Sequence, residues 1–185
     1  MTSSSANVLV GTASVDWYPI TSESSGEPLA ITYGTKESLG WTSDGVTMTV
    51  ATEAADIKVE EVIGTLKRVV TDQTLEVTLN MAEGTLANLN VAIPRTKEDP
   101  AGTLTLGVPD NDTFPYLMGK LVLTGEAPSG KTRTVTLYKV SATGSVGIPY
   151  KKGEISVIPV TFSAMKDGIP ANTATYDKFG EIKDS

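Results

Sequence analysis

The sequence predicts an all-β protein, a β-sandwich or barrel with one long hairpin and one short flanking α-helix. Threonine (26 residues) and valine (18) are abundant, and 17 glycines and 10 prolines supply turns between strands. Apolar and polar residues alternate along much of residues 46–80, which is the period of a sheet with one apolar and one wet face. The chain has 185 residues, 39% hydrophobic and 20% charged, as expected for a single globular domain spanning residues 1–185.

The first zone, residues 1–45, is rich in Ser, Thr, Gly and Pro. We expect it to be irregular, apart from a short strand at residues 8–10 and a flexible polar loop at residues 21–28. Residues 1–7 have neither the cationic segment nor the apolar segment of a signal peptide, so we expect no export by that route. No apolar run approaches the ~20 residues of a membrane span, and no membrane association is expected.

The second zone, from residue 46, opens with a predicted long hairpin that turns near Gly64. Its strands are longer than the roughly 5–6 residues that are usual in globular domains. Long wet strands have edges that pair readily, and joining them to neighbouring subunits in a closed barrel would satisfy those edges. The polar residues predicted to share the wet face are Thr47, Thr49, Asp56, Lys58, Glu60, Glu76, Thr78 and Asn80.

A helix is predicted near residues 82–92, where apolar residues recur at roughly helical spacing until Pro94 ends the run. A charged turn at residues 95–102 follows. Strands are expected at 103–107, 117–125, 132–140 and 154–164, with a turn at 126–131. The β core thus runs from 46 to 168, and the polar tail, residues 169–185, is expected to be ordered only by a neighbour.

The absence of two residue types and the net negative charge exclude several classes of function. The chain has no Cys and no His, which removes disulfides, thiolate nucleophiles, Ser-His catalysis and the usual zinc, copper and haem ligands. A net charge of −7 leaves no basic surface to hold nucleic acid by its phosphates. We therefore expect no enzyme activity and no cofactor.

Carboxylates offer the remaining routes to chemistry. Residues 110–112 (DND) resemble the start of a calcium loop, but the sixth position lacks Gly and the twelfth lacks Glu, so a solvated turn is favoured. Glu60 and Glu61 are adjacent in a predicted strand and face opposite sides, so they are a poor pair for glycoside hydrolysis. Glu98 and Asp99 form a second adjacent pair, and the sequence offers no two acids that must share a cleft.

Basic and aromatic residues offer further candidate binding sites. The adjacent basic pairs, at 67–68 and 151–152, are expected to be solvated or to form ion pairs with an acidic partner subunit. Trp17, Tyr18 and Trp41 could line a sugar site, although such residues are more often core or interface anchors.

One pattern runs through several segments of the sequence: residues 42–50 (TSDGVTMTV), Glu53, residues 55–57 (ADI), 75–83 (LEVTLNMAE), 85–89 (TLANL) and a last strand at 152–162 (KGEISVIPVTF), followed by Ala164 and residues 167–168. Together these segments resemble the major tail tube proteins of long-tailed bacteriophages. The similarity covers about residues 42–168. Gly84 departs from it, because a helix former would be expected there.

The resemblance implies a β-sandwich or barrel of the tail tube type that assembles into stacked six-membered rings. Such a tube is a virion component made in the host cytoplasm. Its partners would be itself, the tape measure protein, the tail tip and terminator proteins, and viral DNA that passes through the lumen without specific binding. On this basis the polar hairpin face would line the lumen, with Asp56, Lys58, Glu60, Glu76, Thr78 and Asn80 as lumen-facing residues. An acidic lumen would let a polyanion slide.

Three alternatives remain open at this point. A monomeric β-sandwich binding module, carbohydrate-binding or adhesin-like, would need an aromatic platform. An enzyme acting through carboxylates would need two acids in one cleft. The tube of a contractile injection machine would share the architecture and add a sheath partner.

Overall fold

The computed structural model describes residues 13–23, 31–57, 67–99, 102–107, 117–149, 156–166 and 178–185. Most of them lie in strands, and they include a single α-helix, which confirms the predicted all-β class with one short helix. The elements are β1 (Ser14–Glu23), β2 (Ile31–Tyr33), β3 (Glu37–Ser38), β4 (Thr42–Ile57), β5 (Lys67–Met81), α1 (Leu86–Ala92), β6 (Thr96–Asp99), β7 (Thr103–Leu106), β8 (Met118–Ala127), the 3-10 turn η2 (Pro128–Gly130), β9 (Lys131–Thr143), β10 (Ile158–Ala164) and β11 (Gly180–Asp184).

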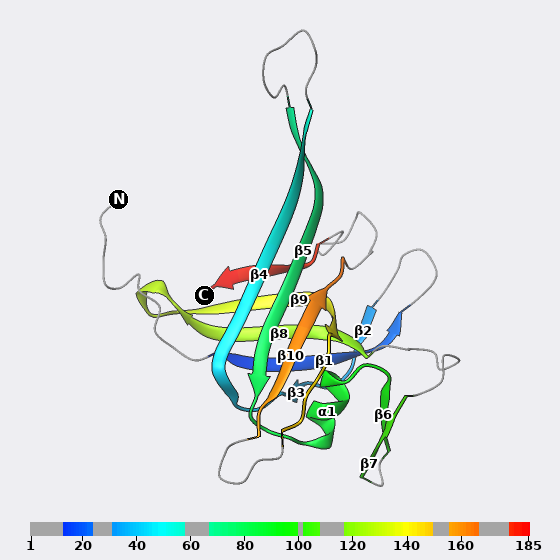
Figure 1. Cartoon of the computed structure of the whole chain (residues 1–185). Helices are drawn as coiled ribbons and strands as arrows, with labels where there is room; N and C mark the ends of the chain where they lie inside the picture. The colour runs from blue at the N-terminus through cyan, green and yellow to red at the C-terminus, as the bar shows by residue number, and fades with distance from the viewer. Residues whose placement is uncertain are drawn as a thin grey trace.

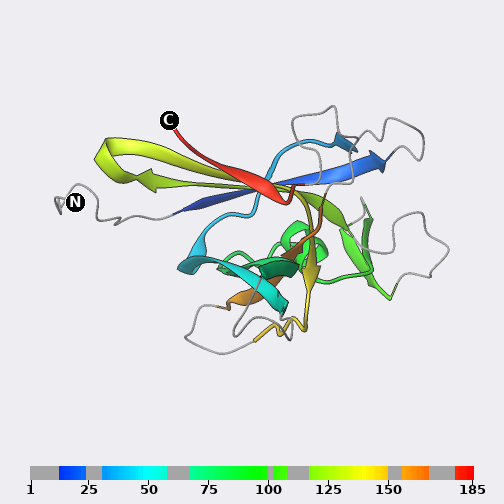
Figure 2. The same ribbon diagram turned by 90° about the horizontal axis from the view of Figure 1, so that it is seen from above.

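One antiparallel sheet folds over itself to make two layers (Figure 1). The main strand order is β2-β1-β8-β9-β10-β5-β4, with β3 on β1 and β11 on β9. We call β1, β8, β9 and β11 the crosswise layer, and β10, β5 and β4 the arm layer. Viewed from above, the two layers lie on opposite sides of the body, and their strands cross steeply (Figure 2).

Strand β9 belongs to both layers and turns the sheet. One edge of β9 pairs with β8, while the other edge pairs first with β11, over residues 133–137, and then with β10, over 140–143. The β8 register shifts between Gly119, opposite Val140, and Leu121, opposite Leu137, so β9 has one extra residue there. Such a bulge bends the strand, and it lies where the second edge of β9 passes from one layer to the other.

The core fills the space between the layers. Trp17 of β1 and Phe162 of β10 are fully buried and stack with ring centroids 5.6 Å apart, so one contact joins the two layers. In the arm layer, alternate residues point inward, as period-2 patterning predicts. The buried residues of this layer are Val77, Leu79, Met81, Ile158, Val160, Phe162 and Ala164.

Helix α1 closes the end of the sandwich at which β4 begins and β5 ends, opposite the projecting part of the hairpin (Figure 1). It begins at Leu86 rather than at the predicted residue 82, because Thr85 is the N-cap and its side chain accepts the Asn88 N–H. Asn88 is buried, and its amide donates to the carbonyls of Leu39 and Glu83, at 3.2 and 2.9 Å. These bonds tie the helix to both flanks of the β4–β5 hairpin.

Three sequence predictions about irregular regions are wrong. Residues 1–45 were expected to be irregular, yet β1, β2 and β3 lie there, and β1 provides the core residues Val15 and Trp17. Residues 96–99 form strand β6, paired with β7, where a charged turn was expected. The polar tail contains β11, which pairs with β9 of the same chain. Residues 8–10, most of 21–28 and residues 167–177 lie outside the described part.

The predicted strands of the second half are confirmed, within a few residues at their ends, as β7, β8, β9 and β10. The turn between β8 and β9 contains η2, with positive φ angles at Ser129 and Gly130, as expected for a run of turn residues. The long hairpin is confirmed as β4 and β5, with 16 and 15 residues.

Replacing Gly119 with alanine tests the joint between the layers. A β-carbon at this position would lie 2.4 Å from Cζ2 of Trp17, so the buried ring would have to move. We expect Gly119→Ala to lower the free energy of unfolding by about 1–3 kcal/mol in urea titrations. Gly147→Ala is the matched control, because a β-carbon there meets nothing within 4 Å, and its stability should stay near that of the wild type. Equal effects of the two substitutions would contradict the packing argument.

Candidate assembly surfaces

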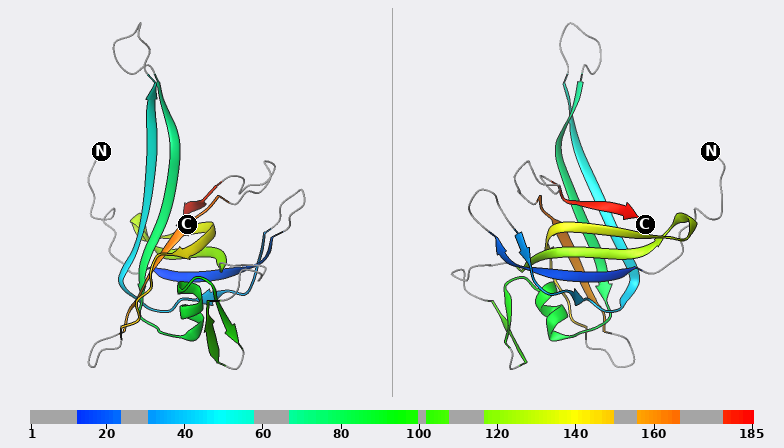
Figure 3. Two further views of the ribbon diagram at one scale, coloured as in Figure 1. Left: turned by 45° about the vertical axis from the view of Figure 1, so that its right-hand side comes forward. Right: turned by 180° about the vertical axis from the view of Figure 1, so that it is seen from behind.

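The β4–β5 hairpin extends beyond the body as a two-stranded arm (Figure 3). Strand β10 pairs with β5 only over residues 76–81, and β4 has β5 as its only neighbour among the described strands. We define the arm as residues 50–57 of β4 with 67–75 of β5. Within the described residues both edges of this ribbon are open, so its backbone groups are available to other strands. An isolated two-stranded ribbon is at best marginally stable in water.

A β-bulge divides the arm. Glu53 pairs with Asp72 and Ala54 with Val70, so Thr71 is an extra residue on β5. Alternation along β4 continues through this point. Two β5 residues an even number of positions apart therefore lie on opposite sides of the ribbon when the bulge is between them.

Residues that were predicted to share one face lie on different sides of the ribbon. Glu76 pairs with Thr49, and Asp56 lies seven positions further along β4, an odd number that assigns it to the opposite side of the ribbon. Asp56 faces Arg68 and binds it through two hydrogen bonds of 2.7 and 3.2 Å. The guanidinium is held by that carboxylate, which raises the pKa of Arg68.

Apolar side chains are exposed on both sides of the arm. Val50 and Val70 are 50% and 60% exposed on the side continuous with the core. Ile57 and Val69 are 45% and 38% exposed, and their register assigns them to the opposite side. Because each of these side chains is already about half buried, a partner that removed the rest from water would add roughly 1 kcal/mol per side chain. The arm therefore combines open strand edges with exposed apolar surface.

The outer face of the arm layer, between the base of the hairpin and the bulge, has a different chemistry. One row of register positions carries threonine on four adjacent strands: Thr143 of β9, Thr161 of β10, Thr78 of β5 and Thr47 of β4. The outward register positions of β4, β5 and β10 over this span include three carboxylates, Glu53, Asp72 and Glu76, and no lysine or arginine. This surface is hydroxylic and acidic.

Of the six residues predicted to face a lumen, three lie together on this outer face: Glu76, Thr78 and Asn80. Asp56 lies on the other side of the ribbon, and Lys58 and Glu60 are outside the described residues. Sequence reasoning missed Glu53 and Asp72, which oppose each other directly across the two strands. Counting back from Glu76 in steps of two would have reached Asp72. Like charges in this position cost stability, so folding alone gives no reason for them.

The structure describes only some of the other candidate residues. The described residues contain no group of three or more acidic side chains arranged to hold a metal ion. Glu98 is exposed, while residues 60–61, 110–112 and 151–152 lie outside the described part. Trp17 is fully buried, so it cannot contribute to an aromatic platform for sugar.

Tyr18, by contrast, shares the Lys120 ammonium with Tyr33. The ammonium lies 4.2 and 4.6 Å from the two ring centroids. An ammonium over two rings is a stabilising surface contact.

A groove of about 410 Å³ lies between the base of the arm and β11. Met48, Val50 and Leu75 line it from the hairpin, and Phe179 and Ile182 line it from the C-terminal segment. Strand β11 is held against β9 by backbone pairing and by Arg133, which donates to both carboxylate oxygens of Asp184 at 2.7 Å. The groove thus ends at a strand whose side chains are mostly exposed.

Comparison with models of known protein families and with curated proteins finds no match. Among the described residues, no helix has the length and apolar character needed to cross a bilayer.

The Arg133–Asp184 pair predicts that the attachment of β11 depends on pH. The guanidinium lowers the pKa of Asp184 below its ordinary value, so the pair stabilises β11 at neutral pH and is lost as the pH falls through that depressed pKa. We expect amide hydrogen exchange in residues 180–184 to accelerate below about pH 4, relative to the intrinsic rate, before the core exchanges.

Asp184→Asn should produce the same acceleration at pH 7 and remove the pH dependence. Asp56→Asn, which breaks a similar pair on the arm, is the matched control and should leave β11 unchanged. If Asp184→Asn has no local effect, the ion pair does not hold the strand.

Proposed function

We propose that this chain is a structural subunit that assembles with copies of itself into rings, and that the rings stack into the tail tube of a long-tailed bacteriophage. One observation carries the proposal: the arm is a two-stranded ribbon with open edges and exposed apolar side chains on both sides. A monomer gains nothing from such a ribbon, because its open edges expose it to uncontrolled pairing. Neighbouring copies would supply the missing strands and bury Val50 and Val70.

The outer face supports the second half of the proposal. In the assembled ring, the arm layers of neighbouring copies would join edge to edge and turn this face toward a central channel. Hydroxyl groups and the carboxylates of Glu53, Asp72 and Glu76 would then line it. The described outward positions of β4, β5 and β10 carry no cation over this span, and an acidic surface does not hold phosphates, so duplex DNA would move past it without binding. Ring closure uses lateral edges, and head-to-tail stacking is the heterologous contact that produces an open filament.

Assembly of the purified chain is the first test. Negative-stain electron microscopy and size-exclusion chromatography at several concentrations should show rings or tubes with a central hole. Val70→Lys should remove them, because a charged side chain would have to be buried in the contact, while the free energy of unfolding of the monomer changes by less than about 0.5 kcal/mol.

Leu106→Lys is the matched control for this test. Leu106 is 65% exposed, close to the 60% of Val70, but it lies on β7 away from the arm. This variant should assemble as the wild type does. A chain that stays monomeric even when tail tip and tape measure proteins are supplied as a nucleus would contradict the proposal.

Charge reversal tests the channel. In tubes carrying Asp72→Lys and Glu76→Lys, we expect short duplex DNA to be retained at low salt, protected from nuclease, and released as salt rises. Wild-type tubes should retain none. Tubes with Glu126→Lys and Glu181→Lys, which change the same total charge on the crosswise layer, should bind DNA only in a nuclease-sensitive form. Equal protection in both double variants would contradict the assignment of the outer face to the channel.

A further inference from the structure

The largest exposed apolar side chain of the described residues lies just outside the arm layer. Trp41 is 80% exposed, whereas Trp17, the chain's other tryptophan, is fully buried. Trp41 immediately precedes Thr42, the first residue of β4, whose free edge continues into the arm. A strand that paired with this edge would therefore pass beside the indole. Exposed tryptophans at such positions are typical energetic centres of protein interfaces.

Trp41 forms one wall of a cavity of about 480 Å³, and Glu83 is its charged residue. The other lining residues are Ala13, Ser14, Ser38, Gly40 and Thr42. Oε1 of Glu83 accepts the Trp41 backbone N–H at 3.1 Å. A β-carbon on Gly40, which has a φ of +75°, would lie 2.3 Å from the Glu83 carboxyl carbon, so glycine leaves room for this group. The carboxylate is thus fixed by the backbone of Trp41, and both residues line the same cavity.

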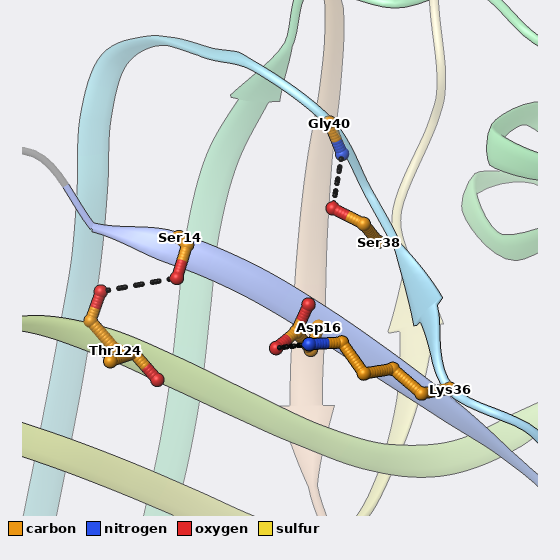
Figure 4. Close-up of polar contacts among 6 residues, drawn as sticks. All are labelled: Ser14, Asp16, Lys36, Ser38, Gly40 and Thr124. Atoms are coloured by element: carbon orange, nitrogen blue, oxygen red, sulfur yellow. Dashed lines mark hydrogen bonds and ion pairs between the residues drawn. The ribbon is translucent and has the colours of Figure 1, made fainter.

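Two polar side chains of the cavity, Ser14 and Ser38, and a nearby ion pair already have partners (Figure 4). Lys36, which precedes β3, is already bound to Asp16 at 2.8 Å. The hydroxyl of Ser38 accepts the Gly40 N–H, and the hydroxyl of Ser14 donates to the Thr124 carbonyl. Among the described residues, no lysine or arginine forms an ion pair with Glu83.

We propose that Trp41 and Glu83 bind a lysine or arginine side chain from a neighbouring copy of this chain, with the cation over the indole and paired with the carboxylate. The face of an indole is the most favourable aromatic surface for a cation, and a fixed carboxylate beside it adds a charge-assisted hydrogen bond. The neighbouring copy is the occupant because the site continues the open edge of β4. The inference rests on the proposed self-assembly.

The two tryptophans make the contact measurable in the full chain. Acrylamide should quench Trp41 in the monomer but not the buried Trp17. As the chain assembles, we expect the quenchable fraction of the fluorescence to fall. In Trp41→Phe, which leaves only Trp17, assembly should leave the quenching unchanged.

Glu83→Gln separates the charge from the packing, because the amide oxygen still accepts the Trp41 N–H. We expect it to raise the concentration of half-assembly about two- to fivefold and to weaken its salt dependence, with the unfolding midpoint of the monomer unchanged. Glu126→Gln is the matched loss of one negative charge on β8 and should assemble as the wild type does.

The outcomes distinguish this inference from the proposed function. Tubes in which Trp41 stays as quenchable as in the monomer would overturn the binding site alone. Shielded Trp41 with normal assembly of Glu83→Gln would show apolar packing and overturn the cation site. A chain that never assembles would overturn both.

Discussion

The packing of Trp17 against the backbone of Gly119 and the ring of Phe162 is the constraint on which the rest of the structure depends. Trp17 and Gly119 belong to the crosswise layer and Phe162 to the arm layer, so this contact joins the two layers. It lies beside the β9 bulge that turns the sheet. Because a glycine leaves no side chain between β8 and the indole, the crosswise layer comes close enough for Phe162 of the arm layer to stack on the same ring. The direction of the arm layer follows from that turn, and so does the projection of the hairpin away from the body.

The regular parts of this fold could be predicted from sequence because their side chains alternate without interruption. The alternation in residues 74–81 and 117–140 predicts strands directly. The β4–β5 hairpin, α1 and the later strands were therefore predicted from the sequence. Strand β1 was missed because Ser, Thr and Pro dominate the composition around it, although Val15 and Trp17 alternate as a strand requires. Strand β11 has one apolar residue, Ile182, so its pairing depends on the edge that β9 offers. The wrong grouping of Asp56 with Glu76 comes from β4 itself, where the apolar residues change from even to odd positions between Val50 and Ile57. Following the apolar pattern instead of the position number places Asp56 on the wrong side.

The bulge at Thr71 marks the boundary between two parts of the ribbon with different surfaces. Below it, the outer side of the hairpin is hydroxylic and acidic and the inner side belongs to the core. Above it, each side has an exposed valine, and Asp56 is neutralised by Arg68. In the proposed assembly, this difference allows a single hairpin to line a channel near its base and to bind neighbouring subunits further out.

The pairing of distant segments has a consequence for the order of folding. β1 pairs with β8 from Ser14 to Thr124, so the first described strand stays without that partner until most of the chain is available, whereas β4 and β5 close over a short loop. Closing the hairpin costs less chain entropy than pairing β1 with β8, so the hairpin can form before the rest of the sheet. A ribbon with open edges is then present while the core is still incomplete, which is when wrong pairings with other chains are most damaging. The carboxylates opposed at Glu53 and Asp72 repel a second copy of the same ribbon at this stage, so the charge that weakens the hairpin would also slow its premature association.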